Sequence, residues 1–294
     1  MQDNHFSRTA QVMALFRALE TARPRRARVV HDPFAKTVLP APMRGMVAMS
    51  RLPPFRRAVC AIIDRRWPGA RSSGVARTRL IDDWVSTGVR DGACQVVILG
   101  AGFDSRAWRL GALQGLPVFE VDHCATSIEK RRRLRAAGLD PERVTLVGMD
   151  FIQDLLADAL DRTGFDPRQR TIVIWEGVTN YLSEDAVEAV LAWTGGLAPD
   201  SLLAFTYVHA RVLAEPSAFA GAERILAAVA RTGEAWTFAI DPAQLESRLA
   251  AHGLTLVEDL GADDYRARVC DSRDAHACGY AFYRAALASV RGPA

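Results

Sequence analysis

Residues 96–122 constrain the fold of this chain more than any other stretch. They begin with the apolar run Val96-Val97-Ile98-Leu99, which breaks into Gly100-Ala101-Gly102-Phe103-Asp104-Ser105-Arg106. After a helix-length segment they end in Pro117-Val118-Phe119-Glu120-Val121-Asp122. An apolar strand, a glycine turn, a helix and a second strand together form the first parallel unit of a doubly wound α/β sheet.

The glycines and the terminal carboxylate of this unit indicate a nucleoside-binding edge. Gly100 and Gly102 would let a ligand lie directly on the backbone, and Asp122 stands where a carboxylate accepts hydrogen bonds from a ribose diol. Ser105 replaces the third glycine of the dinucleotide fingerprint, the one that lets the helix approach closely enough to seat a pyrophosphate. The pattern therefore favours S-adenosylmethionine (SAM), which carries no phosphate, over NAD.

Five further segments complete the predicted sheet. Residues 143–148, 171–175 and 202–207 are near-continuous apolar runs, as expected of parallel strands buried on both faces. Residues 254–258 and 280–283 alternate instead, which predicts a final pair that includes an antiparallel strand. The expected fold is α/β, a doubly wound, seven-stranded, Rossmann-like methyltransferase sheet.

The predicted sheet begins only after residue 90. Residues 1–90 carry amphipathic helical patterns and several prolines without a glycine-turn strand, and we expect them to form a helical cap and lid over the ligand edge. Residues 91–294 would form the cofactor-binding core. Within that core, an inserted helix at about 211–233 is a candidate lid.

Composition excludes several classes of protein. A net charge of +3 is too small to argue for a nucleic-acid partner, and the run 130–133 (Lys-Arg-Arg-Arg) lacks interleaved aromatics for base stacking, so we interpret it as a solvated helix face. No apolar run has the length of a membrane span, and the N-terminus does not resemble a signal peptide. The sequence contains no C-x-x-C pair, so a metal site is not indicated. The odd number of cysteines fits free thiols in a cytoplasmic protein. The cysteines are Cys60, Cys94, Cys124, Cys270 and Cys278.

Five separated segments, taken together and in order, resemble the leucine carboxyl methyltransferase family over roughly residues 10–285. They are His31-Asp32-Pro33-Phe34-Ala35, Leu99 to Arg106, Phe119 to Asp122, Glu176-Gly177-Val178-Thr179-Asn180-Tyr181-Leu182, and Gly233-Glu234-Ala235-Trp236-Thr237-Phe238. The family uses SAM to methylate oxygen. Its members include a protein-phosphatase carboxyl-terminus methyltransferase, a modified-tRNA enzyme and bacterial polyketide O-methyltransferases. The short loops here are most similar to the bacterial branch.

The resemblance implies a cofactor-binding role for residues that match the family motifs. Gly100 and Gly102 would contact the cofactor through their backbone, and Asp122 would bind the ribose with Glu120 beside it. Asp150 and Phe151 would hold the adenine. Glu176 would lie close to the methionine portion, and Arg77 would pair with the methionyl carboxylate. A guanidinium is the natural bidentate partner of a buried carboxylate. The phosphatase enzymes also carry a lysine near the N-terminus that meets this carboxylate. No lysine has that spacing here, and Arg17 and Arg25 are the candidates to replace it.

The candidate catalytic residues, Tyr181 and His209, follow the ends of the fourth and fifth predicted strands, where an open α/β sheet binds its substrate. Phe103, Trp236 and Phe238 would supply the walls of a pocket for a bulky organic acceptor. A carboxylate acceptor is ionised at neutral pH and needs no general base, whereas a hydroxyl acceptor would need one, with His209 as the candidate.

The sequence therefore predicts a SAM-dependent O-methyltransferase acting on a carboxylate or hydroxyl of a small molecule, in polyketide or other secondary metabolism. No nucleic-acid or membrane partner is expected, and the oligomeric state stays open. Two alternatives remain: a protein C-terminal carboxyl methyltransferase, and a non-catalytic adenosyl-ligand-binding protein. An NAD-dependent oxidoreductase is disfavoured by Ser105.

Overall fold

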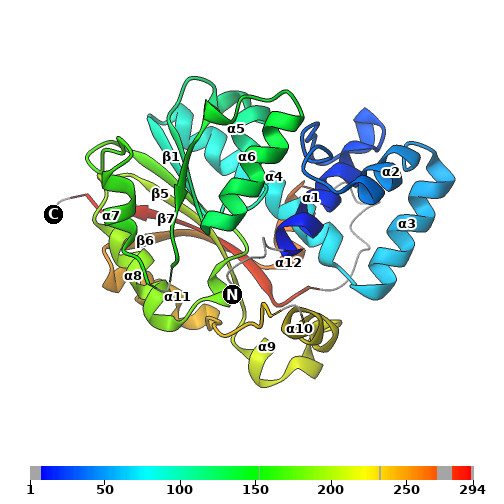
Figure 1. Cartoon of the computed structure of the whole chain (residues 1–294). Coiled ribbons are helices and arrows are strands. Elements are labelled where there is room, and N and C mark those ends of the chain that lie inside the picture. Colours follow the sequence, from blue (N-terminus) through cyan, green and yellow to red (C-terminus); the bar gives the residue numbers. More distant parts are fainter. Residues whose placement is uncertain (1–7, 152, 232, 270–279, 293–294) are drawn as a thin grey trace.

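The computed structural model describes residues 8–151, 153–231, 233–269 and 280–292, which contain a seven-stranded sheet flanked by helices (Figure 1). The strand order is β3-β2-β1-β4-β5-β7-β6, with β7 antiparallel to both of its neighbours and the other pairs parallel. This topology confirms the predicted fold class. The strands are β1 (Gln95–Leu99), β2 (Val118–Asp122), β3 (Thr145–Gly148), β4 (Thr171–Trp175), β5 (Leu202–Val208), β6 (Leu254–Leu260) and β7 (Tyr283–Val290).

The helices fall into a group before the sheet and a group between or after its strands. The first group is α1 (Arg8–Thr21), α2 (Ala41–Met49), α3 (Pro53–Arg66) and α4 (Ala70–Arg90). The second is α5 (Arg106–Arg109), α6 (Cys124–Ala136), α7 (Leu156–Asp161), α8 (Glu184–Gly195), α9 (Arg211–Ala214), α10 (Ala222–Arg231), α11 (Pro242–Ala251) and α12 (Ala262–Val269). Short 3₁₀ turns lie at η1 (Arg25–Ala27), η2 (Gly111–Leu113), η3 (Pro141–Arg143), η4 (Thr179–Tyr181) and η5 (Pro216–Ala218).

The central strand β1 shows why these residues form a sheet covered on both faces. Successive side chains of a strand point to opposite faces. Val97 and Leu99 join the apolar cluster that α7, α8 and α11 cover, and Val96 and Ile98 join the cluster that α4 and α12 cover. The apolar run of the sequence is therefore buried on both sides, as predicted.

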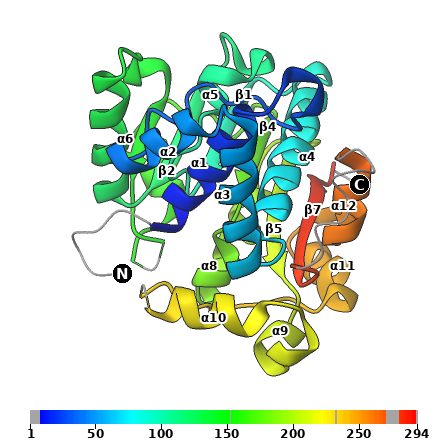
Figure 2. The same ribbon diagram turned by 90° about the vertical axis from the view of Figure 1, so that its right-hand side faces the viewer.

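Helix α4 connects the sheet to the cap. Its residues Ile81 and Val85 pack on the sheet, whereas Val75 packs with α1, α2 and α3, which lie at the right-hand end of the molecule in Figure 1 and face the viewer in Figure 2. Ala10 of α1 stands directly over the glycine turn, since a Cβ added to Gly102 would lie 2.9 Å from Ala10 Cβ. The cap thus covers the edge of the sheet where β1 ends.

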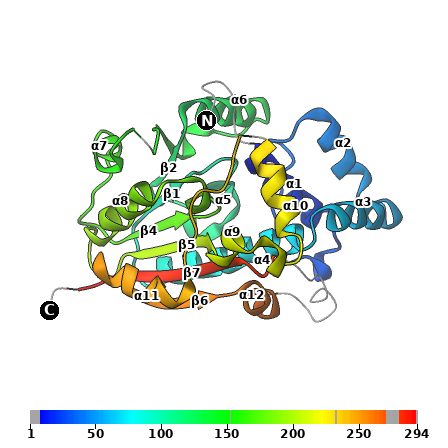
Figure 3. The same ribbon diagram turned by 90° about the horizontal axis from the view of Figure 1, so that it is seen from below.

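Two predicted elements differ from the structure. The last strand was predicted at 280–283 but runs from Tyr283 to Val290, because Tyr280 has a φ of 60° that no strand tolerates. The alanine-rich stretch that follows has low strand propensity, and its burial between β5 and β6 overrides that preference. The inserted helix predicted at about 211–233 is divided into α9, η5 and α10, which lie beneath the sheet in Figure 1 and near its β5 end in Figure 3. Pro216 and Gly221, which has a φ of 84°, interrupt it.

Two sequence expectations concern the whole chain. No helix within the described residues combines the length and apolarity needed to cross a membrane. Cys60, Cys94 and Cys124 are free thiols, and Cys270 and Cys278 lie outside the described residues.

Candidate cofactor site

The turn after β1 brings together three of the predicted cofactor residues. Gly100 and Gly102 have φ values of 62° and 48°, in the left-handed region that favours glycine. A Cβ on Gly100 would lie 2.3 Å from Val178 Cγ2, so the loop after β4 packs directly against the turn. The Gly102 amide donates to Asp122 Oδ2 at 2.5 Å, and the His123 amide donates to Oδ1 at 2.7 Å. The turn and the carboxylate therefore meet as the sequence predicted.

Asp122 keeps capacity for a ligand. A carboxylate offers about four lone-pair positions, and two backbone amides use only part of them. Burial raises the pKa of Asp122, and the hydrogen bonds from Gly102 and His123 oppose that rise. The end of β2 can thus still accept hydrogen bonds from the hydroxyls of a ribose.

Glu120 lies two residues before Asp122 on β2, so the two carboxylates share one face of the strand, and Glu120 also pairs with a lysine of α6. Its side chain is fully buried, and Lys130 Nζ of α6 donates to its Oε2 at 2.5 Å. Burial raises the pKa of Glu120 to about 7, although Lys130 opposes the rise. Lys130 is itself buried, so the run 130–133 is not uniformly a solvated face, whereas Arg132 within it is exposed and pairs with Glu129. Lys130 departs from the predicted solvated face because α6 lies against the sheet beside β2, where its side chain reaches Glu120.

Arg77 and Glu176 face each other across a short gap. Arg77 lies in the middle of α4, Glu176 follows β4, and Arg77 Nε is 3.7 Å from Glu176 Oε1. Both atoms are buried, and neither has a hydrogen-bond partner in the described part of the chain. The guanidinium lies 3.9 Å from the centre of the Tyr283 ring and donates to Ser73 Oγ at 3.2 Å. Burial lowers the pKa of Arg77, but the nearby Tyr283, Tyr265 and Glu176 raise it more, so the cation is retained.

Arg106 is a site residue that the sequence reasoning missed. It is almost fully buried, and it donates to Asp82 Oδ1 and to Glu176 Oε2, each at 2.8 Å, as well as to Asp104. Burial opposes the charge of Asp104, yet Arg106 and Lys130 hold the pKa of that carboxyl well below its usual range. Arg106 therefore fixes one oxygen of Glu176 and leaves the other free. The sequence signal that could have identified Arg106 as a site residue is its position at the end of the glycine-turn motif, residues 99–106.

Asp32, from the His-Asp-Pro-Phe segment, ties the cap to the glycine turn. Its Oδ2 accepts from Arg17 Nε at 2.8 Å and from the Ser105 hydroxyl at 2.6 Å. Arg17 also donates to the Phe103 carbonyl at 2.6 Å. Burial would raise the pKa of Asp32, but Arg17, Arg109 and Ser105 lower it below its ordinary value. Neither arginine that could replace the lysine of the phosphatase enzymes therefore lies at the predicted site of the cofactor carboxylate. Arg17 forms an ion pair with Asp32, and Arg25 is exposed on η1.

Asp150 and Phe151 lie just past β3, at the same edge as Asp122. Gly148 pairs with Asp122 in the β2–β3 register, so the segment Asp150-Phe151 begins two residues beyond that pair. The Asp150 amide donates to Asp154 Oδ2 at 2.8 Å, and Phe151 is partly buried against the core that α7 and α8 cover. The predicted adenine-binding residues therefore adjoin the predicted ribose-binding residue.

Tyr181 is the first of the two candidate catalytic residues, and it lies within a group of aromatic side chains. Burial raises its pKa to about 12, so the phenol remains protonated at neutral pH. Trp236 packs on Tyr283 with ring centres 6.1 Å apart and on Phe282 at 5.8 Å. This aromatic group reaches Arg77 through Tyr283. Trp236 is half-buried and lies within it, as expected for a pocket wall, whereas Phe238 belongs to the core on the other side of the sheet.

His209, the second candidate, follows β5 and packs on Phe219 with ring centres 5.8 Å apart. Its Nδ1 accepts a hydrogen bond from the Arg211 amide at 3.2 Å, so the neutral ring carries its proton on Nε2. Burial lowers the pKa of His209. With its lone pair already engaged, this imidazole is poised to donate a hydrogen bond, and the geometry opposes the predicted role of general base.

The sheet order, the glycine turn and the carboxylates at the strand ends define the fold and ligand edge of a Rossmann-like methyltransferase. The chain belongs to the leucine carboxyl methyltransferase family, whose sequence model matches residues 10–195. It is 39% identical over 191 residues to a protein of Frankia alni provisionally named an S-adenosyl-L-methionine-dependent methyltransferase. That match covers 64% of this chain and 64% of the relative, so it spans less than two thirds of either protein. A Streptomyces avermitilis protein with the same kind of name is 39% identical over 186 residues, covering 63% of this chain and 62% of the relative. These names agree with the predicted cofactor.

Two solved structures share the fold. A DUF574 family protein from Streptomyces avermitilis superposes with a TM-score of 0.62 at 16% identity, covering 98% of this chain and 99% of its own. A provisionally assigned methyltransferase from Thermobifida fusca gives a TM-score of 0.59 at 19% identity, covering 81% of this chain and 89% of its own.

Proposed function

We propose that this protein transfers the methyl group of SAM to a carboxylate oxygen of a small organic molecule. The observation that carries the proposal is a pair of buried atoms that make no hydrogen bond within the described residues: Arg77 Nε in α4 and Glu176 Oε1 just after β4, 3.7 Å apart. Buried polar groups of native proteins are almost always satisfied. An unpaired donor and an unpaired acceptor in one place fit a ligand with a carboxylate and an ammonium group, which is the amino-acid end of SAM.

The other end of the cofactor would meet groups that are also in place. Asp122 would accept hydrogen bonds from the ribose, and Asp150 with Phe151 would hold the adenine at the neighbouring strand end. When bound, SAM supplies a methyl group on a sulfonium, which is already an activated leaving group. The protein must then hold the acceptor oxygen in line with that methyl and keep water out. Helix α1, which lies over the glycine turn, would help to exclude water.

The acceptor side favours a carboxylate over a hydroxyl. Neither candidate catalytic residue is set up as a base, because Tyr181 has a pKa of about 12 and the His209 lone pair is engaged by the Arg211 amide. An ionised carboxylate needs no base. One buried donor near Tyr283, the Asn180 side-chain amide nitrogen, lacks a hydrogen-bond partner within the described residues and would suit an acceptor oxygen.

The experiment is methyl transfer from tritiated SAM to a panel of aromatic and aliphatic carboxylic acids and matched phenols. We expect a carboxylic acid to be labelled, with the label released by mild base because the product is an ester. The rate should be flat from about pH 6 to 9, and His209→Ala should lower it by less than about fivefold.

A different result would contradict the carboxylate proposal. A base-stable product, a rate that rises through about pH 6 to 8, and a loss of about a hundredfold in His209→Ala would indicate a hydroxyl acceptor and a general base. SAM binding without transfer to any acid or phenol would support the non-catalytic adenosyl-ligand-binding alternative.

A further inference from the structure

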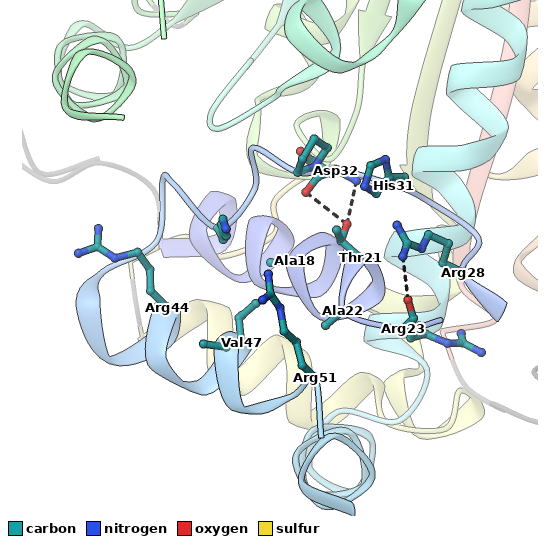
Figure 4. A pocket seen from close by; sticks show the side chains of 13 residues that line it. Ala18, Thr21, Ala22, Arg23, Arg28, His31, Asp32, Arg44, Val47 and Arg51 are labelled. Atoms are coloured by element: carbon teal, nitrogen blue, oxygen red, sulfur yellow. Dashed lines mark hydrogen bonds between the residues drawn. The ribbon is translucent and has the colours of Figure 1, made fainter. Parts of the chain in front are cut away.

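A cavity lies in the cap, outside the set of predicted cofactor residues. It has a volume of about 600 Å³, within the usual range of about 300 to 1,000 Å³ for small-molecule sites, and it lies between α1, α2 and the segment that joins them (Figure 4). Its wall is hollow because small side chains occupy the facing positions of the two helices. These are Ala18 of α1, Ala22 directly after that helix, and Val47 and Ala48 of α2.

Long basic side chains surround this hollow. In Figure 4, Arg51 extends from the end of α2 toward Ala18 on α1, while Arg28 and His31 lie beyond Thr21 on the other side of that helix, and Arg44 points outward. The basic residues that line the cavity are Arg23, Arg28, His31, Lys36, Arg44 and Arg51.

Carboxylates of the protein do not neutralise most of this charge. Arg23 pairs with Glu20 at 3.1 Å, but Arg28, Lys36 and Arg51 form no ion pair with a described carboxylate. Arg28 donates to the Arg23 carbonyl at 3.0 Å, and its Nε is buried without a hydrogen-bond partner within the described residues.

The carboxylate in the cavity wall does not offset the cations either. Asp32 is 1% exposed, and its oxygens accept hydrogen bonds from Arg17, Ser105 and the amides of Phe34 and Ala35. Its charge is balanced inward, so the cavity retains an uncompensated positive potential. Exposed cations on a convex face are usually only hydrated, whereas cations around a hollow with one buried, unpaired guanidinium nitrogen form a binding site for negative charge.

We propose that this cavity binds a small, multiply charged oxyanion, a phosphorylated or polycarboxylated metabolite. Guanidinium groups from two sides suit the paired oxygens of a phosphate or a carboxylate. The apolar floor of alanine and valine would contact the carbon skeleton of such a ligand. The site is separate from the cofactor edge, because none of the residues that line it is Gly100, Asp122, Arg77 or Glu176.

The test is calorimetric titration of the whole chain with inorganic pyrophosphate and, separately, with citrate, in the presence of saturating S-adenosylhomocysteine. We expect saturable binding of at least one probe, and the tighter one identifies phosphoryl or carboxylate chemistry. The double variant Lys36→Gln/Arg51→Gln should weaken that binding about tenfold or more, since both side chains are exposed and can be changed without harm to the fold. Arg28→Gln is an independent second variant.

The matched control is Arg162→Gln/Arg231→Gln, which removes two exposed charges elsewhere and should change the affinity by less than about twofold. If the cavity variants and the control variant lost equal affinity for the probe, the loss would come from the change in net charge alone, and the proposal would be overturned. Failure of both probes to bind at millimolar concentration would also overturn it.

Discussion

Arg77 lies deep in α4 with most of its guanidinium already engaged. Tyr283 covers one face of the group, and Ser73 accepts from one of its terminal nitrogens. Its Nε makes no hydrogen bond within the described residues and lies 3.7 Å from Glu176 Oε1, which makes none either. A residue held this firmly with one free donor is pre-organised for a ligand, because little rotamer entropy remains to be lost on binding.

Replacing Arg77 should therefore separate two ligands that differ only at the amino-acid end. We expect Arg77→Ala to weaken SAM binding about tenfold or more and to change the binding of methylthioadenosine, which lacks the carboxylate, by less than about twofold. Arg77→Lys should restore part of the loss, because a point charge cannot reproduce the guanidinium fork. Calorimetry with both ligands measures the difference.

Arg79, two residues further along α4, is the matched control, since it is exposed and pairs with Asp83 at 2.9 Å. Arg79→Ala should leave both affinities unchanged. Equal losses for SAM and methylthioadenosine in Arg77→Ala would mean that Arg77 supports the fold instead of binding the carboxylate.

The cap helix α1 depends on a buried cluster of charges for its position. Arg17 of α1, Asp32 of the following segment and Ser105 of the glycine turn meet in one hydrogen-bonded set. Ser105 thus has a role that replaces the missing third glycine: its hydroxyl ties the turn to the cap. The cluster thus joins the His-Asp-Pro-Phe segment to the glycine turn in this chain.

Breaking this cluster should affect stability and cofactor binding together. Asp32→Asn keeps the shape of the side chain but leaves Arg17 buried without its counter-charge, which should cost about 3 kcal/mol or more of unfolding free energy. SAM affinity should also fall, because the turn loses its support. Urea unfolding and calorimetry measure the two effects.

The exposed pair Arg79–Asp83 again gives a control, since an ion pair at the surface contributes little. Asp83→Asn should lower stability by no more than about 0.5 kcal/mol. A similar small loss in Asp32→Asn would show that the cap is held by its apolar packing alone.

At the scale of the whole molecule, one buried pair links stability to pH. Glu120 and Lys130 meet between β2 and α6, and burial raises the pKa of Glu120 from 4.5 to about 7. A folded-state pKa above the unfolded value means that the native protein binds this proton more tightly. The resulting stabilisation is complete below about pH 4.5 and is lost as the pH rises through about 7.

Glu120→Gln should remove this part of the pH dependence. Between about pH 4.5 and 8, the unfolding free energy of wild type should fall by about 2 to 3 kcal/mol relative to the variant. Denaturant unfolding at several pH values provides the comparison. Glu142→Gln, at an exposed position, should run parallel to wild type. If the stability of Glu120→Gln followed the same pH dependence as wild type, the proton that links stability to pH would not be bound at Glu120.

The sequence alone determined the sheet, the order of its strands along the chain and the edge at which the candidate cofactor residues gather. These follow from local signals: apolar runs of strand length, a glycine turn that requires positive φ, and carboxylates at strand ends. Gly100, Gly102, Asp122, Asp150 and Glu176 all lie at the predicted edge because parallel strands place their carboxyl ends together.

Tertiary structure decided what local signals do not contain. Only the packing of α6 pairs Glu120 with Lys130, whereas Asp122, two residues further along the same strand, is held by the amides of Gly102 and His123. The role of Arg106 depends on Asp82 and Glu176, which are distant in sequence. The last strand runs through an alanine-rich segment because β5 and β6 enclose it. In each case the free energy comes from burial and charge pairing between remote segments, and a local pattern carries no record of these.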